Sequence, residues 1–587
     1  MRREAIPAVG VFALVATLGF DEGGYSATAW GWSGVVLLAV LAVLLAGGVR
    51  RPRAAAVVLV AALAALTAWI AASILWSSDV SASVLEVERA LVYVAAASVF
   101  VLAASGPALV AGVLGASTVL CGYGLARWLL GNPEVPLSAD PQAGERLSEP
   151  IGYANGVAIL AVLGLLAAVG FAARASRTAA AAAAAPVPLL AATLYFTFGR
   201  GAWLALAVGL AVAVAIGPRR LRLAATAFAL SVPAALAVVA GERLGASAAV
   251  AALVPLLCLL AAAVPLLLGA AEDVYRPSPR ARVAFAATLI GLPAVVAAVA
   301  LVKLGGPSGA YDAFKAAPTP THGDASSRVL SLSGSNRADY WSVAWESYER
   351  HPLLGSGAGS YARTWVRERP VPQPVTDAHS LYLETLAELG PLGLALLLVG
   401  LAMPFAGSRT GWAAAALGPY AAFLAHAVQD WDWELPAVTV AALACGAAPL
   451  AGQVGRAVPR AGAAIAVALC AAALLAFLGN QAVADAMNAS DRLAWGEAAD
   501  AARRARSLQP WSPEPWRLLG EVELAEGSLP AARRYFRSGL REDSADWELW
   551  LDLGLASEGA ARREAFARAG ALNPLSPELR ELRFKTG

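Results

Sequence analysis

The chain has 587 residues, of which 58% are hydrophobic and only 15% charged, and its mean hydropathy is +0.61. Soluble domains carry about 25% charged residues, so this composition excludes an ordinary soluble protein. The net charge of +2 comes from basic residues spread through short segments, which gives no reason to expect nucleic-acid binding. We therefore expect an all-α, polytopic transmembrane helical bundle.

Apolar stretches recur along the chain at about the 20-residue length that crosses ~30 Å of hydrocarbon. They predict about fifteen membrane spans, or twelve to fifteen if some helices are split. The first stretch follows MRRE, and no small-residue cleavage site precedes Asp21, so we expect a retained helix rather than a signal peptide. The predicted spans are 5–20, 32–49, 54–75, 89–104, 107–130, 152–173, 179–198, 201–217, 221–240, 247–270, 283–302, 391–407, 411–429, 436–455 and 461–479.

Arginines between these spans predict the orientation, because short cytoplasmic loops are rich in basic residues. If every stretch crosses the membrane, most of the arginines between the spans lie on one side. They are Arg2, Arg3, Arg50, Arg51, Arg53, Arg174, Arg177, Arg219, Arg220, Arg222, Arg276, Arg280, Arg282, Arg409, Arg456 and Arg460. Short loops on the other side hold only Arg89, Arg146, Arg200 and Arg243. We expect a cytoplasmic amino terminus, with the long segment 303–390 and the carboxyl-terminal region on the outer side.

Four cysteines lie within apolar spans, without CxxC or metal-ligand spacing, and are expected to pack as small apolar residues. They are Cys121, Cys258, Cys445 and Cys470. We divide the chain into membrane helices at 1–302, a large outer loop at 303–390, further membrane helices at 391–480 and a helical tail at 485–587.

The outer loop is the longest polar insertion in the membrane body. Its Gly/Pro/Ser-rich lead-in, 304–334, contains His322, which we interpret as a solvated loop residue. Further on, spacings of three and four residues predict a short helix lying on a surface. His379 begins a second helical pattern that runs into the next span. The residues with the helical spacing are Arg337, Asp339, Trp341 and Trp345.

The tail repeats itself. The sequence WRLLG at Trp516 returns as WLDLG at Trp550, thirty-four residues later. A period of about 34 with paired helices is typical of tetratricopeptide repeats, so the tail resembles two to three such units. These arrays form concave surfaces for extended partners, and a protein partner is therefore expected. The alternative is a helical cap that only stabilises the last membrane helix.

Short motifs also follow one another in a fixed order between the spans. They are GRG at Gly199, RADYWSVAW at Arg337, HPLLGSG at His351, AHSLYLE at Ala378 and ELGPLG at Glu388. In this order they resemble the O-antigen ligase and polymerase family, over about 70–450 and most densely over 335–395. The resemblance implies a glycosyltransferase of the bacterial cytoplasmic membrane that uses polyprenyl-diphosphate-linked glycans, inverts the anomeric centre and needs no metal or cofactor.

The family's essential outer-loop arginine and histidine map onto Arg337 and His379, with Arg200 as a second arginine. Arginine binds phosphate oxygens bidentately, at ~1.5–3 kcal/mol for each charge-assisted bond. Two arginines can thus take the place of a divalent metal, and the outer loop has no carboxylate cluster that would bind one. Imidazole titrates near 6.5 in peptides, and nearby arginines disfavour its protonated form, which suits a general base that contributes ~10²–10⁴ in rate. We expect Arg146 and Trp341 to complete the substrate site.

Each site residue has an alternative interpretation. His379 would cap an interfacial helix, Arg337 would be an exposed helix residue, and Arg200 would extend toward the membrane interface. For Arg146, with Asn155 in RLSEPIGYAN, a turn and helix start is the favoured interpretation over a donor site.

Other polar residues remain open or receive structural interpretations. We expect His426 and Asp430 to share a helix face at the end of a span. They would form an acid/base pair or, as the favoured interpretation, belong to an interfacial belt with two tryptophans. The belt tryptophans are Trp431 and Trp433. Arg89 is interpreted as part of an ion-paired helix start with Glu86 and Glu88, and His351 as a structural turn residue. Headgroup attraction and loop solvation are both open for Arg363, Arg367 and Arg369.

Ligase, polymerase and protein O-glycosyltransferase differ in their acceptor, which is a glycan, lipid or protein, and the motifs do not distinguish them. A lipid-linked-oligosaccharide flippase or small-solute transporter is the alternative from another class. It should show duplicated halves and polar, broken helices at mid-membrane, which the sequence lacks. In a third alternative, the membrane part only anchors a scaffold formed by the tail.

Overall fold

The computed structural model describes residues 2–103, 105–131, 146–274, 302–316, 333–407, 411–457 and 460–586, with a few positions between 278 and 299. Most of the predicted span 283–302 lies outside the described residues, as do His322, Arg276, Arg282 and Arg409. Within the described part, nine helical stretches are long and apolar enough to cross a membrane, and three shorter helices are also apolar. The prediction of an all-α, polytopic membrane protein is confirmed.

The amino-terminal half of the body is a succession of apolar helices. They are α1 (Arg2–Phe20), α2 (Ala27–Ala46), α3 (Ala54–Ser73), α4 (Val80–Val101), α5 (Gly106–Leu130), α6 (Ala154–Ala172), α7 (Arg177–Ala184), α8 (Val187–Phe196), α9 (Arg200–Ile216), α10 (Arg220–Leu244) and α11 (Ala248–Val274). The segment 303–390, predicted as the outer loop and called the outer segment below, and the remaining body contain α13 (Gly306–Lys315), α14 (Arg337–Arg350), α15 (Tyr361–Glu368), α16 (Leu381–Ala402), α17 (Ala413–His426), α18 (Pro436–Ala447) and α19 (Ala461–Asp491).

Helix α6 is the centre of the bundle. Nearly all of its side chains are buried, and α5, α7, α8, α9 and α17 pack around it. Small residues permit this packing: a Cβ added to Gly170 would lie 2.4 Å from the Cα of Ala415. In a membrane, an apolar helix surface is as well accommodated by lipid as by another helix. Helix association therefore depends on the close packing that small residues permit.

Predicted and observed boundaries differ at several places. The span 179–198 is two helices, because the chain turns at Pro186 before α8. Helix α16 begins at Leu381, as the pattern after His379 predicts, and is broken at Gly390, directly before the predicted span 391–407, because the φ of 66° and ψ of −172° there are not helical. Helix α19 continues through the boundary predicted at 480–485; its 31 residues are ~46 Å long, more than a bilayer core requires.

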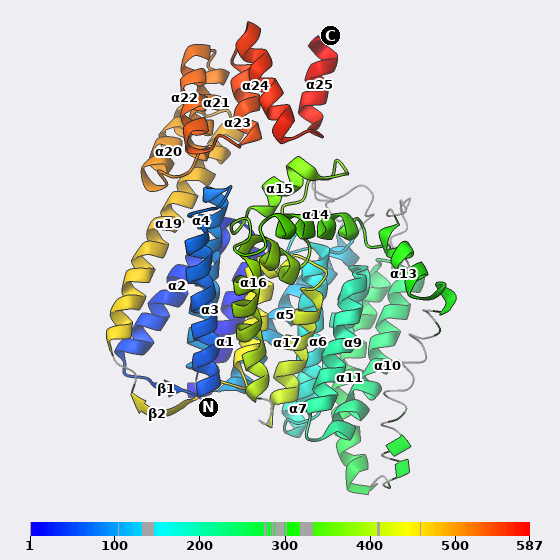
Figure 1. Cartoon of the computed structure of the whole chain (residues 1–587). Helices are drawn as coiled ribbons and strands as arrows, with labels where there is room; N and C mark the ends of the chain where they lie inside the picture. The colour runs from blue at the N-terminus through cyan, green and yellow to red at the C-terminus, as the bar shows by residue number, and fades with distance from the viewer. Residues whose placement is uncertain are drawn as a thin grey trace.

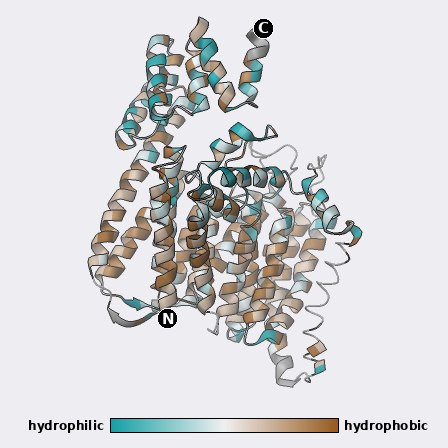
Figure 2. Ribbon diagram, viewed as in Figure 1, coloured by the Kyte–Doolittle hydropathy of each residue, from teal (hydrophilic) through white to brown (hydrophobic). Residues whose placement is uncertain are grey.

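The outer segment and the tail lie at the same end of the bundle. Figure 1 shows α14 and α15 across the end opposite the amino terminus, with the tail helices beyond them. The amino terminus lies near the antiparallel pair β1 (Arg50–Pro52) and β2 (Gln453–Ala457). Figure 2 shows the bundle predominantly hydrophobic, and the outer segment and tail rich in hydrophilic positions.

The tail consists of paired helices. They are α20 (Trp495–Leu508), α21 (Glu514–Ala525), α22 (Leu529–Glu542), α23 (Trp547–Leu555), α24 (Gly559–Leu572) and α25 (Pro577–Thr586). The repeated glycines have matching surroundings, since a Cβ on Gly520 would meet the ring of Phe536 and one on Gly554 the ring of Phe566, both at 2.4 Å. Each glycine lets an aromatic ring approach the preceding helix closely. Assignment to the tetratricopeptide class stays a prediction.

Candidate active site

Arg337 is the first residue of α14, after a turn in which Ser335 and Asn336 have positive φ. Its side chain is 16% exposed. Nη2 donates to Asp430 Oδ2 at 2.8 Å, Nη1 to the Gly334 carbonyl at 3.2 Å, and Nε to the Gln429 carbonyl. A guanidinium has five N–H donors, so three of them fix its position and two remain for a ligand.

Asp430 holds Arg337 from the loop after α17, and its side chain is only 3% exposed. Its carboxylate also accepts from the Tyr153 hydroxyl at 2.6 Å, Asn155 Nδ2 at 2.7 Å and the Trp431 N–H at 3.0 Å. Burial by itself would raise the pKa of this carboxyl, but the charge of Arg337 lowers the pKa of Asp430 to about 2. The pair is therefore ionised at neutral pH.

Arg146 belongs to the same hydrogen-bond network, and Asn155 lies between it and Asp430. It donates from Nη2 to Asn155 Oδ1 at 2.5 Å and from Nε to the Thr197 carbonyl at 2.7 Å. Asn155, in the first turn of α6, thus joins Arg146 to Asp430. This arrangement matches the turn and helix start that the sequence favoured, and it ties that turn to the segment that precedes α9.

Arg200 is the first residue of α9 and donates from Nη2 to the Ser335 hydroxyl at 3.2 Å. A Cβ on the next residue, Gly201, would lie 2.5 Å from Gln429 Nε2 and 3.3 Å from His426 Nε2. Only glycine therefore lets the start of α9 approach this loop so closely. Arg200 and the positive end of the α9 dipole therefore lie beside Ser335 and the loop at Gln429, next to Arg337.

His379 lies in a tight turn just before α16, with a φ of 53°. Its backbone N–H donates to Asp377 Oδ1 at 3.0 Å, and its ring Nδ1 lies 2.7 Å from the same oxygen. Because an ionised carboxylate only accepts, Nδ1 carries the proton in the neutral ring and Nε2 keeps its lone pair. The ring also packs on Tyr340, at 5.0 Å between centroids, one turn after Arg337.

The structure thus connects Arg337, Arg200 and His379 through shared neighbours: Ser335 and the loop at Gln429 on one side, and Tyr340 on the other. Trp341 is not part of this group. Its ring stacks on Phe314 of α13, with centroids 5.3 Å apart. The charged group in contact with the His379 ring is Asp377, which the sequence reasoning did not include.

The expectation that His426 and Asp430 share a helix face is wrong. Helix α17 ends at His426, so Asp430 is not on its face, and His426 Nδ1 contacts Asp432 Oδ2 at 2.7 Å instead. Trp431 packs on Tyr153, with centroids 4.5 Å apart, and so contacts one of the residues that hold Asp430. The role of Asp430 was missed because its only sequence signal was a charge at the end of an apolar span. Asp377 was missed although it precedes His379 by two residues.

The other basic residues have structural partners. Arg89 pairs with Glu86 at 2.5 Å, as predicted, and with Glu434 at 3.0 Å, whereas Glu88 accepts from Asn480. The predicted helix start is wrong, because α4 begins nine residues earlier, at Val80. His351 caps the end of α14, which agrees with a structural role.

Comparison with known proteins supports the family resemblance. Residues 185–398 match the family model described as O-antigen ligase. The matched segment contains Arg200, Arg337 and His379 and ends before Asp430, so it is shorter than the predicted 70–450. No curated protein matches the chain. The match supports a membrane enzyme of the ligase or polymerase kind, with a lipid-linked glycan donor and a glycan acceptor.

Proposed function

We propose that the chain is a membrane glycosyltransferase that transfers a glycan from a polyprenyl-diphosphate donor to an acceptor hydroxyl. The site lies at the outer face of a bacterial cytoplasmic membrane. The observation that carries this proposal is the convergence of Arg337, Arg200 and the Asp377–His379 pair around the loop at Gln429–Asp430. The O-antigen ligase match over 185–398 supports the reaction class.

The two arginines and the start of α9 form the anion-binding side of the site. Arg337 is fixed by three hydrogen bonds and has two N–H donors left for phosphate oxygens. Arg200 adds a second charge beside the N-terminus of α9, where phosphate groups are favoured. We assign both arginines to the diphosphate, whose negative charge grows as it leaves.

His379 is the base in this proposal. Its Nε2 accepts the proton of the acceptor hydroxyl while the hydroxyl oxygen forms a bond to the anomeric carbon of the donor. The bond between that carbon and the diphosphate oxygen breaks, and the diphosphate takes the electron pair. Asp377 fixes the orientation of the ring and stabilises the imidazolium that results. Inversion and independence of metal are what the family resemblance implies.

The distribution of arginines supports the proposed orientation. The end that holds the amino terminus also holds β1, with Arg50 and Arg51, and the start of α7 at Arg177. An arginine-rich end is expected to face the cytoplasm. The opposite end, with α14 and the candidate site, then faces outward.

A reconstituted transfer assay tests the proposal. The full chain in nanodiscs is supplied with a polyprenyl-diphosphate glycan and a panel of glycan, lipid and peptide acceptors, with and without chelator. We expect Arg337→Ala and His379→Ala to abolish transfer, and the exposed tail variant Arg503→Ala to retain it. Full transfer by both site variants would refute the proposed roles and favour the transporter alternative. Loss of transfer with chelator would refute independence of metal.

A further inference from the structure

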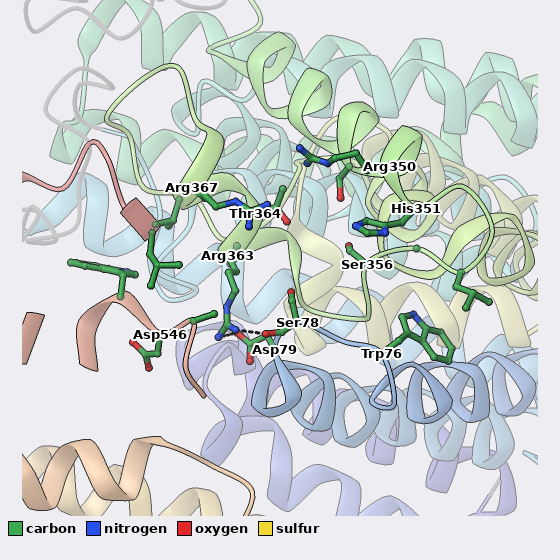
Figure 3. Close-up of a pocket in the computed structure, with 18 of the residues that line it drawn as sticks. Trp76, Ser78, Asp79, Arg350, His351, Ser356, Arg363, Thr364, Arg367 and Asp546 are labelled. Carbon is green, nitrogen blue, oxygen red and sulfur yellow. Dashed lines mark hydrogen bonds and ion pairs between the residues drawn. The ribbon is translucent and has the colours of Figure 1, made fainter. Parts of the chain in front are cut away.

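A large cavity lies away from the candidate active site, between the outer segment and the tail. Its volume is about 750 Å³, and three parts of the chain form its walls: the loop before α4, the region from α14 to α15, and the start of α23. Figure 3 shows Trp76 and Asp79 on one side, Arg350 and His351 across from them, and Asp546 of the tail at the far end.

This cavity is distinct from the site at Arg337. Helix α14 connects the two, because Arg337 begins the helix and Ser347 and Arg350, near its end, line the cavity. At 1.5 Å per residue, the ten to thirteen residues between them correspond to ~15–20 Å. A chain-like ligand that extends along α14 would therefore reach both places, whereas a single small molecule would not.

Ion pairs and hydrogen bonds hold the walls together. Arg363 of α15 pairs with Asp79 of the membrane body at 3.0 Å and also with Asp543 of the tail. Arg369 donates to Asn573 of the tail at 2.9 Å, in a buried contact. These contacts cross between segments that are far apart in the sequence, so they fix the tail against the outer segment. Arg363 and Arg369 thus have structural partners, which neither the expected headgroup attraction nor loop solvation describes.

The lining combines aromatic rings with hydrogen-bonding groups. Trp76 and Trp547 stand on different walls, and Ser356, Arg350 and Arg367 supply hydroxyl and guanidinium groups. The charged lining residues are three arginines and two aspartates, so their charges nearly balance. Sugar rings present an apolar C–H face to indole rings and hydroxyls to polar groups, and a nearly neutral wall suits them better than a diphosphate.

We infer that this cavity binds a saccharide, namely a part of the acceptor glycan remote from the reacting hydroxyl. The identification of a glycan as the ligand rests on the proposed function. The saccharide has two sources, a soluble oligosaccharide or the sugar headgroup of a glycolipid. Leu353, 78% exposed at the cavity wall, offers an apolar contact toward the lipid in the second case.

Binding is measured by saturation-transfer NMR and titration on the full chain in nanodiscs. The probes are a panel of defined neutral and acidic oligosaccharides, the same glycans attached to lipid, and a set of extended peptides. We expect Trp547→Ala to weaken saccharide binding about five- to tenfold, through loss of a stacking face. Ala545→Trp should block binding by filling the cavity without removing a contact at Trp547. Trp511→Ala, an exposed tryptophan of the tail outside this cavity, should bind like the wild type.

The outcomes separate this inference from the proposed function. Arg337→Ala should lose transfer and keep saccharide binding, because its side chain is remote from the cavity. Transfer by the wild type without saccharide binding, or binding unchanged in both cavity variants, overturns the inference alone. Peptide binding that requires Trp547, without saccharide binding, also overturns it. Absence of both transfer and saccharide binding overturns the two proposals together. A gain in affinity on attachment to lipid, with soluble glycans still bound, supports the glycolipid source.

Discussion

Replacement of Asp430 by asparagine tests the arrangement on which the site depends. The carboxylate receives four donors, from Tyr153, Asn155, Arg337 and the Trp431 backbone. An amide of the same shape has one oxygen and an NH₂ group, so at least one of these donors would face another donor. The substitution also leaves the buried charge of Arg337 without its counter-ion.

The cost is estimated in two ways. Removal of one partner of a buried ion pair typically costs ~3–5 kcal/mol. The lowered pKa of Asp430, about 2 against an ordinary 3.8, corresponds to ~2–3 kcal/mol of stabilisation at neutral pH. We therefore expect Asp430→Asn to lower the free energy of unfolding by ~2–5 kcal/mol. Glycan transfer should fall as well, because Arg337 loses its orientation.

The assay is denaturant unfolding of the purified protein in detergent, together with the transfer assay. The matched control is Asp500→Asn in the tail pair Arg503–Asp500, whose side chains are 53% and 70% exposed, and which should change stability by less than ~0.5 kcal/mol. The double variant Arg337→Met with Asp430→Asn should be less destabilised than the sum of the single variants, because it leaves no unpaired charge.

The pH dependence has a definite sign. The pKa of Asp430 is lower in the folded state, so the carboxylate stabilises the fold above pH 4. This contribution to the free energy of unfolding is lost as pH falls from about 4 to 2, because the unfolded chain is protonated at a higher pH than the folded one. Asp430→Asn should lack this component. If the variant unfolds within ~0.5 kcal/mol of the wild type and keeps full transfer, Asp430 does not hold Arg337 and the reasoning is refuted.

Three further predictions concern other parts of the chain. Asp377→Asn should lower kcat about 10²-fold or more with little change in KM, because His379 loses its orienting carboxylate; an unchanged kcat would contradict this role. Arg363→Ala and Asp543→Ala should each speed proteolysis of the tail, and the double variant should add little to either; additive effects would show that they do not act as a pair. Burial raises the pKa of Asp552 to about 7, so the tail loses stability as pH rises from about 4 to 7. Asp552→Asn should therefore slow hydrogen exchange in the tail at pH 7 and leave it unchanged at pH 4, and equal effects at both would contradict the assignment.

Local patterns in the sequence were enough for the architecture. Runs of apolar residues without charge form helices because a lipid-exposed backbone must satisfy its own hydrogen bonds. The spacing from Arg337 to Trp345 predicted α14, and the pattern after His379 predicted the start of α16. Boundaries failed where a turn lies inside an apolar run, as at Pro186 between α7 and α8. Arg337, Arg200 and His379 could be proposed from the sequence because the family motifs that contain them are local.

Only the tertiary structure decided which groups face one another. Arg337 and Asp430 are 93 positions apart, and Arg363 and Asp543 are 180 apart. Nothing in the local sequence specifies such partners, because a charge near the end of an apolar span has the same pattern whether it faces water, lipid or another charge. The cavity beside the tail depends likewise on how three distant segments pack. The sequence determines which side chains are present, whereas the distances between them in the site are set only when the helices pack together.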